Sequence, residues 1–322
     1  MVCSASCVKL LKSIALTLLV AGLTVAQALA AAALRPAVVP QDFVVTPFGY
    51  YHPSCINHLA KGDVLRQDIK AIERANGITQ NIELCAYPHY LADGQKVMAD
   101  APAPKDPPNI SHAWIEYASI TTTGAYGQIY TEWEVPPSPT SNDGQTVYLF
   151  NGMEDSNDVV TIIQPVLGWN SDYSAAWSIA AWNCCVNGQV NEATPAHTNP
   201  GDHLEGYVFM NCVKGTRVCS SWDIVIVDEE SGAFSELLDT SNYSQQFNWA
   251  FGGVLEVYNI AQCTDYPPPD YAGGIGFHNE SVLNAQFAVV SNPAWTVTNL
   301  ASGLTPQCSY GGSLPKQVTL TY

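Results

Sequence analysis

The chain has 322 residues, with 12 Lys or Arg against 29 Asp or Glu, and its formal net charge at pH 7 is −17. A protein that binds nucleic acid needs a basic surface to neutralise phosphates, so this balance argues against that class. After the first 30 residues no stretch approaches the roughly 20 apolar residues of a membrane helix, so we expect neither a nucleic-acid partner nor a membrane span.

Residues 1–30 have the pattern of a secretory signal peptide. Lys9 and Lys12 precede an apolar run at 13–25, and small residues at 28–30 suit a cleavage site. The apolar run is short for a membrane span. We therefore expect a secreted, extracellular protein.

The segment after the signal contains one predicted helix. Leu65, Ile69 and Ile72 recur at helical spacing. Asp63 is placed to cap the first turn, and Asn76 with the glycine after it marks the stop. The sequence thus predicts a small, partly helical pro-segment.

A proline-rich stretch at 101–109 follows and reads as an extended linker. Such a stretch is a natural domain boundary and a natural place for proteolytic maturation. The expected organisation is therefore a signal peptide at 1–30, a pro-segment at 31–110 and a main domain at 111–322. The charge is uneven across this boundary, because residues from 110 onward include 3 basic and 21 acidic side chains.

The ten cysteines fall into these segments in even numbers, as an oxidising compartment favours. We expect them to pair within segments, without a unique connectivity for the last six. No Cys-x-x-Cys or His-Glu-x-x-His spacing indicates a metal site. The cysteines are Cys3 and Cys7 in the signal, Cys55 and Cys85 in the pro-segment, and Cys184, Cys185, Cys212, Cys219, Cys263 and Cys308 in the domain.

Almost everything after the linker reads as β-structure. About 210 residues of short strands without helical spacers predict an antiparallel two-sheet β-sandwich of the jelly-roll or concanavalin-like kind. Turn signals such as the one at 228–232 separate the strands. The strand candidates are 146–150, 159–164, 222–228, 253–258, 286–290 and 316–322.

Two of these strands carry one polar residue each in an otherwise apolar run. Because side chains alternate along a strand, Glu256 shares a face with Val254 and Tyr258, and Gln164 shares a face with Ile162. A buried amide or carboxyl is costly without partners. From the strands alone, hydrogen bonding to backbone in a sandwich core is the simpler interpretation of each residue.

The spacing of several motifs resembles the eqolisins, a family of glutamic peptidases. Gln164 follows Gly152 by twelve residues, as the glutamine of an Ile-Leu-Gln strand follows a Gly-Ile-Asp-Gly turn in that family. The segment 254–258 is similar to the family's Ile-Ile-Glu-Asp-Phe. Further matches are an Ala-Trp at 176–177, a Trp-x-Val-Pro at 133–136 and Trp114, so the resemblance extends from Trp114 to Tyr322. Plant neprosins share this plan but place Glu at the position of Gln164.

The resemblance implies that 111–322 is the catalytic domain and that it carries a Gln/Glu dyad. Glu256 is expected to act as the base that activates a water, and Gln164 to hold the water and the oxyanion. Substrate-binding positions carry over to Trp114, Phe150, Glu154 and Trp177.

The chain departs from the family pattern at four positions. Phe150 stands for a Trp, Glu154 for an Asp, Ile179 for an acidic residue and Val257 for the Asp after the catalytic Glu. The dyad is intact, and the departures concern the residues around it.

We expect an acid-acting endopeptidase made as a zymogen. Its substrate is a protein or peptide, and the expected form is a monomer without cofactor or metal. The acidic surface suits acidic media, because self-repulsion falls as carboxylates are protonated. Sequons begin at Asn109, Asn242 and Asn279 and predict a glycoprotein if the host glycosylates.

A second class of function is open. Aromatic-lined sandwiches also bind glycans, which makes a lectin-like module or a glycoside hydrolase the alternative, with Glu154 as a partner for Glu256. A sandwich that only binds is a third possibility. The tryptophans at 133, 182, 222, 249 and 295 are assigned to core packing.

Overall fold

A computed structural model describes residues 34–66, 70–101, 113–157, 161–268, 274–302, 306–309, 311–313 and 318–321. Among these residues there are strands and the 3-10 turns η1 (Pro53–Cys55) and η3 (Cys263–Asp265), but no α-helix. No helix in the described part is long and apolar enough to cross a membrane. The predicted signal peptide at 1–30 and residues 102–109 of the linker lie outside the described ranges.

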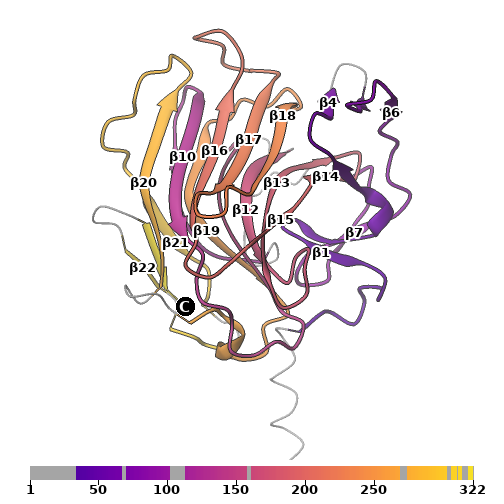
Figure 1. Cartoon of the computed structure of the whole chain (residues 1–322), viewed down its shortest axis with the longest axis vertical. Coiled ribbons are helices and arrows are strands. Elements are labelled where there is room, and N and C mark those ends of the chain that lie inside the picture. The colour runs from indigo at the N-terminus through magenta and orange to yellow at the C-terminus, as the bar shows by residue number, and fades with distance from the viewer. Residues whose placement is uncertain are drawn as a thin grey trace, which may run out of the picture.

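Two large sheets pack face to face, which confirms the predicted two-sheet β-sandwich (Figure 1). The seven-stranded sheet has the order β18 (Phe234–Thr240), β17 (Trp222–Asp228), β16 (His203–Met210), β10 (Tyr126–Glu134), β20 (Ile275–Asn284), β23 (Val318–Thr321) and β22 (Gly311–Ser313). The nine-stranded sheet has the order β21 (Thr296–Asn299), β9 (Trp114–Thr121), β19 (Trp249–Tyr258), β11 (Thr146–Glu154), β12 (Ile162–Trp169), β13 (Trp177–Val186), β14 (Gln189–Ala193) and β3 (Ile56–Leu59), with β15 (Ala196–Thr198) paired to β13.

The two sheets differ in how many of their faces are covered. Along β16 and β17, buried and half-buried residues alternate, as expected for a sheet with one face toward solvent. Along β11, β12 and β19 every residue is buried. One face of the nine-stranded sheet packs on the other sheet, so its second face must be covered by something else.

That cover is the N-terminal segment at 34–101, the predicted pro-segment. Its four-stranded sheet consists of β1 (Val44–Thr46), β2 (Gly49–Tyr51), β7 (His89–Tyr90) and β8 (Lys96–Val97). Aromatic residues of this sheet, including Tyr50 and Tyr51, share one core with Trp182 and Tyr258 of the large sheet. Strand β3 also joins the edge of the nine-stranded sheet, pairing in parallel with β14.

The predicted helix in the pro-segment is wrong. Leu65 lies in β4 (Val64–Arg66) and pairs with Ile72 in β5 (Ala71–Glu73), and β6 (Thr79–Asn81) completes a three-stranded sheet. Ile69 lies outside the described residues. A hairpin also places residues seven apart opposite each other, so the two buried side chains fit either structure. The supposed stop at Asn76 is the turn into β6, where Gly77 has φ 84°.

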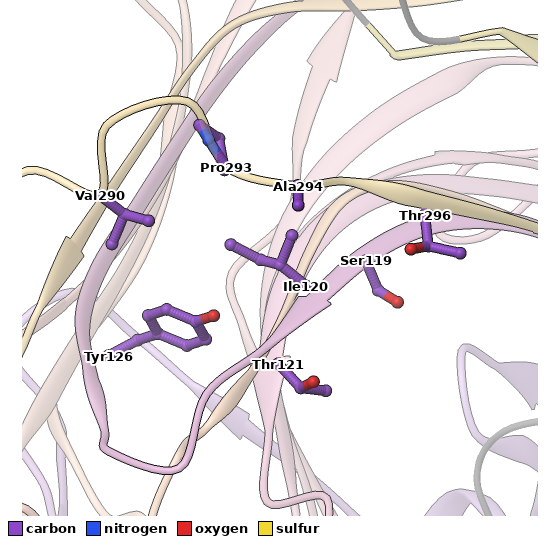
Figure 2. Close-up of a pocket in the computed structure, with 8 residues that line it drawn as sticks. All are labelled: Ser119, Ile120, Thr121, Tyr126, Val290, Pro293, Ala294 and Thr296. Atoms are coloured by element: carbon purple, nitrogen blue, oxygen red, sulfur yellow. The ribbon is translucent and has the colours of Figure 1, made fainter.

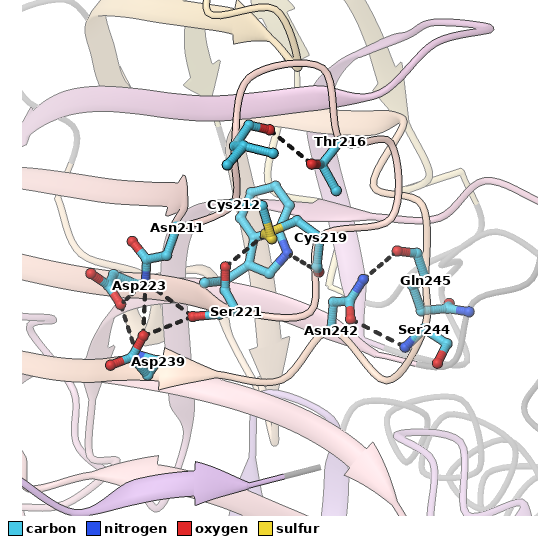
Figure 3. The surroundings of a disulfide bond; sticks show 12 residues. Asn211, Cys212, Thr216, Cys219, Ser221, Asp223, Asp239, Asn242, Ser244 and Gln245 are labelled. Carbon is cyan, nitrogen blue, oxygen red and sulfur yellow. Dashed lines mark hydrogen bonds between the residues drawn. A yellow bond between two sulfur atoms is a disulfide. The ribbon is translucent and has the colours of Figure 1, made fainter. Parts of the chain in front are cut away.

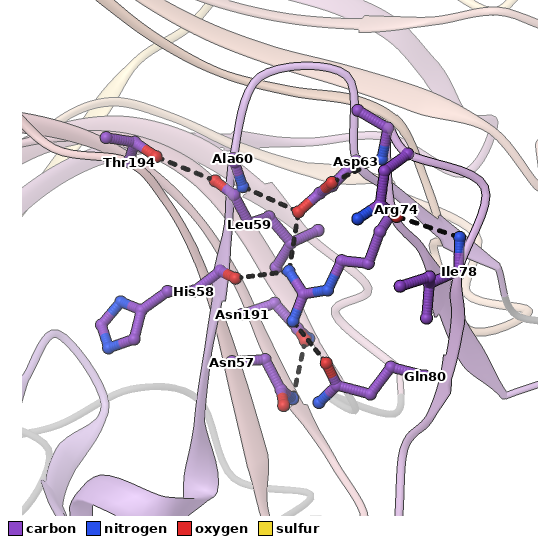
Figure 4. A network of polar contacts seen from close by, with 12 residues as sticks. Asn57, His58, Leu59, Ala60, Asp63, Arg74, Ile78, Gln80, Asn191 and Thr194 are labelled. Carbon is purple, nitrogen blue, oxygen red and sulfur yellow. Dashed lines mark hydrogen bonds and ion pairs between the residues drawn. The ribbon is translucent and has the colours of Figure 1, made fainter.

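A buried carboxylate holds this part of the pro-segment together (Figure 4). Asp63 accepts hydrogen bonds from the backbone N–H groups of Ala60 and Ala75, at 2.9 and 2.8 Å. Arg74 contacts the same carboxylate at 2.7 Å and donates to the carbonyl of His58, in β3, at 2.8 Å. The pair therefore ties the small sheet to β3, the strand that extends the nine-stranded sheet.

The cysteines of the described chain pair within segments, as predicted. Cys212–Cys219 closes the loop between β16 and β17, beside a cluster in which Asn211 donates to Asp223 at 2.7 Å (Figure 3). The other disulfides are Cys55–Cys85, Cys184–Cys185 and Cys263–Cys308.

The strand candidates are mostly present, but the one predicted at 286–290 is wrong. It is a turn after β20 with exposed Phe287 and Val289 and a single isolated bridge between Leu283 and Val289. Of its Phe-Ala-Val-Val run only Val290 packs partly against the core, and the other three residues are exposed.

Candidate active site

Glu256 lies in the middle of the nine-stranded sheet and is completely buried. Its Oε1 accepts a 2.6 Å hydrogen bond from the hydroxyl of Tyr258, and the side chain of Trp114 lies within hydrogen-bonding reach. Oε2 has no hydrogen-bond partner. Burial raises the pKa of Glu256 well above its usual range, and the bonds from Tyr258 and Trp114 oppose that rise.

Gln164 lies on β12 and is also completely buried. Neither its amide oxygen nor its amide nitrogen has a hydrogen-bond partner. Gly152 lies next to it on β11, where a Cβ atom would stand 2.8 Å from the carbonyl oxygen of Ile163 and 3.2 Å from the Cβ of Gln164. The glycine therefore leaves the sheet surface beside the amide free of side-chain atoms.

Both residues project from the same face of the sheet, the face under the pro-segment. Ile162 and Val166 alternate with Gln164 on β12 and belong to the core shared with the pro-segment, as do Val254 and Tyr258 on β19. The predicted face-sharing of Gln164 with Ile162, and of Glu256 with Val254 and Tyr258, is therefore what the structure shows.

The two strands are not adjacent, because β11 runs between them. Glu256 pairs with Tyr148 of β11, whereas Gln164 lies opposite Gly152, four residues further along. In a flat sheet this offset separates the two Cα atoms by about 16 Å.

Three of the four proposed substrate-binding residues line this face. Trp114 and Phe150 are buried with their rings 5.5 Å apart in a T-shaped contact. Glu154 is buried, its Oε2 has no partner, and burial raises its pKa to about 8. Glu154 also acts on Glu256 electrostatically, raising the pKa of that carboxyl further.

Trp177 does not lie on this face. Its ring packs in the core between the two sheets, 5.4 Å from the ring of Trp169, and the side chain is 1% exposed. The residues of β13 that point the other way are Ala180, Trp182 and Cys184. Trp177 and Trp182 are an odd number of positions apart, so a regular strand puts them on opposite faces.

Two tryptophans assigned to core packing, Trp182 and Trp249, are buried in the core on the same face as Gln164 and Glu256, which is called the groove face below. Trp182 packs against Phe48 of the pro-segment, and Trp249 packs against Tyr117 and Phe251. Trp249 is an odd number of residues from Glu256, so strict alternation places it on the other face. The register shift between Phe251 and Gly253 inserts one residue and brings Trp249 back.

A second acidic group lies at the far side of the same face. Glu192, on β14 beside Trp182, contacts Nδ1 of His58 in the pro-segment at 3.0 Å. Burial, and then the charge and hydrogen bond of Asp172, raise the pKa of Glu192 to about 10. The raised pKa favours the protonated form of this carboxyl.

The turn between β1 and β2 covers the candidate site with uncharged groups. Phe48 stands 6.0 Å from the ring of Trp182, Tyr50 stands 5.5 Å from that of Tyr258, and the hydroxyl of Tyr148 donates to the carbonyl of Val45. In the described part of the chain no Lys or Arg pairs with Glu256.

A cavity of about 380 Å³ lies elsewhere, at the edge of the sandwich (Figure 2). It contains neither member of the dyad and no ionisable group except the hydroxyl of Tyr126. Its lining residues are Ser119, Ile120, Thr121, Tyr126, Val290, Pro293, Ala294 and Thr296. Among the described residues, groups with metal-ligand spacing lie on the seven-stranded sheet and not in the groove.

No protein-family model matches the sequence, and no curated protein matches it. Among solved structures, the chain is similar to Scytalido-glutamic peptidase with a peptide-based transition state analog, with 14% identity, 65% of this chain and 98% of that chain covered, and a TM-score of 0.46. It is also similar to SCP-B, a member of the eqolisin family in complex with the tripeptide Ala-Ile-His, with 14% identity, the same coverage and a TM-score of 0.45. At this identity and TM-score the matches carry no conclusion about activity, and the glutamic-peptidase resemblance rests on the sequence motifs. They do not include a neprosin, so that likeness stays a prediction.

Proposed function

We propose that the chain is the zymogen of a glutamic endopeptidase in which Gln164 and Glu256 form the catalytic dyad. One observation supports this most. A fully buried amide with no hydrogen-bond partner shares a sheet face with a fully buried carboxyl that has one free oxygen. Leaving such groups unsatisfied costs about 1–3 kcal/mol each, and a cost of this kind is typical of sites built for a ligand.

The separation of the dyad fits a water and a peptide carbonyl between the two side chains. Side chains stand roughly perpendicular to a sheet, so the gap depends on how far these two lean toward each other. Each reaches roughly 5 Å from its Cα, and when both lean fully together about 6 Å is left of the 16 Å estimated between the Cα atoms in a flat sheet. Two hydrogen bonds of about 3 Å each span that gap. The bare backbone at Gly152 gives an extended substrate room to pass beside the amide.

The chemistry follows from these positions. Ionised Glu256 removes a proton from the water as it attacks the carbonyl carbon, while the amide N–H of Gln164 stabilises the oxyanion. The protonated Glu256 then gives the proton to the leaving nitrogen, which completes hydrolysis without a covalent intermediate. Trp114 and Phe150 provide apolar surface for side chains of the substrate.

The pro-segment at 31–110 keeps the enzyme latent in two ways. It occupies the face on which substrate binds, through Phe48 and Tyr50. It also removes water from Glu256, which raises the pKa of that carboxyl and holds it in the protonated form that cannot act as a base. Removal of the segment, in or near the linker at 101–109, lets water reach Glu256.

The glycosidase alternative has less support. A retaining enzyme needs two carboxyls about 5 Å apart and an inverting enzyme about 6.5–9.5 Å. Glu154 pairs with Trp249, six residues along β11 from Tyr148, the partner of Glu256. This offset corresponds to about 20 Å between Cα atoms in a flat sheet, too far for a retaining pair.

The signal-like start, the described disulfides and the acidic composition support secretion into an acidic, oxidising medium. We include secretion, a peptide or protein substrate and a monomeric form in the proposal.

The test uses protein that begins near His112, with Glu256→Gln as the matched control. We expect the first protein to digest a denatured protein between pH 2 and 6, and the variant to fold but lose activity by about 10²–10⁴-fold. Mass spectrometry of the released peptides maps the cleavage preference. Near-normal turnover in the variant contradicts the dyad. Depolymerisation of a β-glucan or xylan without peptide cleavage establishes the glycosidase instead.

A further inference from the structure

Three potential metal ligands meet on the outer face of the seven-stranded sheet, on the opposite side of the sandwich from the groove. They are Glu132 on β10, His203 at the start of β16 and His278 on β20. One ligand atom from each lies within 4.8 Å of the others. Their side chains are 16%, 35% and 33% exposed, so an ion from solvent reaches them.

The strand register brings these residues together although they are far apart in sequence. Glu132 pairs directly with His278. His203 pairs with Glu134 and is therefore a diagonal neighbour of Glu132. Next to His278 the register shifts, and Asn279 has φ 54°, so two residues of β20 turn toward Glu132.

The distances suit a small tetrahedral ion. Oε2 of Glu132 lies 3.2 Å from Nε2 of His203 and 3.7 Å from Nε2 of His278. In tetrahedral zinc with ligand bonds of 2.0–2.2 Å, two ligand atoms stand about 3.4 Å apart. We propose that Glu132, His203 and His278 bind Zn²⁺, with the remaining position open to water.

Neighbouring residues orient the carboxylate as metal sites require. The hydroxyl of Tyr130 donates to Oε1 of Glu132, and the side-chain amide of Asn279 donates to Oε2 at 2.7 Å. Hydrogen bonds of this kind fix the direction of a ligating carboxylate. Two imidazoles favour zinc over Ca²⁺ or Mg²⁺, which prefer oxygen ligands. The ion links three strands of the sheet, and its role is to stabilise the fold rather than to take part in the dyad chemistry.

The test is zinc binding by the untagged, chelator-treated full chain at pH 7, measured by calorimetry and thermal unfolding. We expect about one equivalent of Zn²⁺ to bind, to raise the unfolding temperature, and to remain bound in excess Mg²⁺ and Ca²⁺. His278→Ala and the size-preserving Glu132→Gln should each weaken binding by at least about 10–100-fold. His197→Ala, which removes an exposed histidine of the other sheet, should bind zinc like the parent.

Asn279→Ala provides a second variant, because it leaves all three ligands in place and should weaken binding roughly tenfold or more. It also removes a sequon, so Ser281→Ala, which removes only the sequon, is its control. The proposal is overturned if the parent shows no saturable zinc binding, if Mg²⁺ displaces the ion, or if His278→Ala and Glu132→Gln bind zinc as the parent does. These readouts do not depend on peptidase activity.

Discussion

The hydroxyl of Tyr258 donates a 2.6 Å hydrogen bond to Oε1 of Glu256, two residues earlier on the same strand. Both side chains point to the groove face because residues two apart on a strand lie on the same side of the sheet. The bond leaves Oε2 of Glu256 free and fixes the direction in which it points. In the proposed mechanism Oε2 is therefore the atom that takes the proton from water.

Tyr258→Phe should shift the pH dependence of the mature enzyme. The hydrogen bond favours the ionised carboxyl and lowers the pKa of Glu256, so its loss raises that pKa. Since the base must be ionised, the acidic limb of the kcat/KM profile should move to higher pH while the maximal rate falls less than in Glu256→Gln. The profile is measured on a peptide substrate from pH 2 to 7. If its acidic limb is unchanged, the base that titrates is a group other than Glu256.

Gln164→Met should make the protein more stable and less active. The amide is buried without partners, and an apolar side chain of similar shape removes an unsatisfied group that costs about 1–3 kcal/mol. Loss of the oxyanion donor should lower kcat roughly 10²–10³-fold. Chemical denaturation of the full chain and turnover of the mature enzyme check the two halves. A variant that is less stable and equally active shows that Gln164 has only a structural role.

The sequence predicted which face of the sheet a residue lies on only where the strand is regular. Alternation correctly placed Glu256 with Val254 and Tyr258. It fails for Trp249, because two glycines in the same strand allow a register shift that reverses the faces beyond them. The position of Trp177 was carried over from a motif. The structure places Trp182 on the groove face, and Trp177, five residues earlier on the same strand, therefore lies on the opposite face.

Other features depend on contacts between distant segments. Leu65 and Ile72 have a spacing that a helix and a hairpin share, and only the pairing of β4 with β5 decides between them. Glu132, His203 and His278 come from three strands, so no local spacing indicates a metal site. The apolar cover at Phe48 could not be predicted because nothing in the sequence says which face a separate segment packs on.

Glu154 should make the zymogen less stable as the pH rises. Burial raises its pKa from 4.5 to about 8, and unfolding returns it to 4.5. The pKa of Glu154 is higher in the folded than in the unfolded chain. Its contribution to the free energy of unfolding is therefore fully present below about pH 4.5 and is lost between that pH and about 8. In Glu154→Gln the free energy of unfolding should decline less over this window. Urea denaturation of both proteins at pH 4.5, 6 and 8 measures the difference, and parallel curves contradict the assignment.

Asp63 should set the pH at which the pro-segment opens. Burial alone would raise its pKa, but the hydrogen bonds from Arg74, Ala75 and Ala60 outweigh burial and hold the pKa below its usual 3.8. An acid whose pKa is lower in the folded than in the unfolded chain stabilises the folded state at pH values above its unfolded pKa. This stabilisation is lost as the pH falls through the folded pKa. The raised pKa of Glu154 has the opposite effect on stability. It favours the folded state, in which the pro-segment covers the dyad, as the pH falls into the weakly acidic range. The network around Asp63 should therefore fail only below about pH 4.

Asp63→Asn removes that charge at every pH, so its pro-segment should already be cleaved rapidly at pH 5, roughly tenfold faster than the parent's. Limited proteolysis of the Glu256→Gln chain by a fixed amount of added acid protease, followed by N-terminal sequencing, measures opening without self-activation. Asp93→Asn is the matched control, because Asp93 is an exposed turn residue of the same segment whose side chain accepts from the N–H of Gln95. If the two variants are cleaved alike at each pH, the acid trigger lies outside the Asp63–Arg74 pair, and the charge attraction between the seven basic residues of 31–109 and the acidic domain becomes the explanation to test.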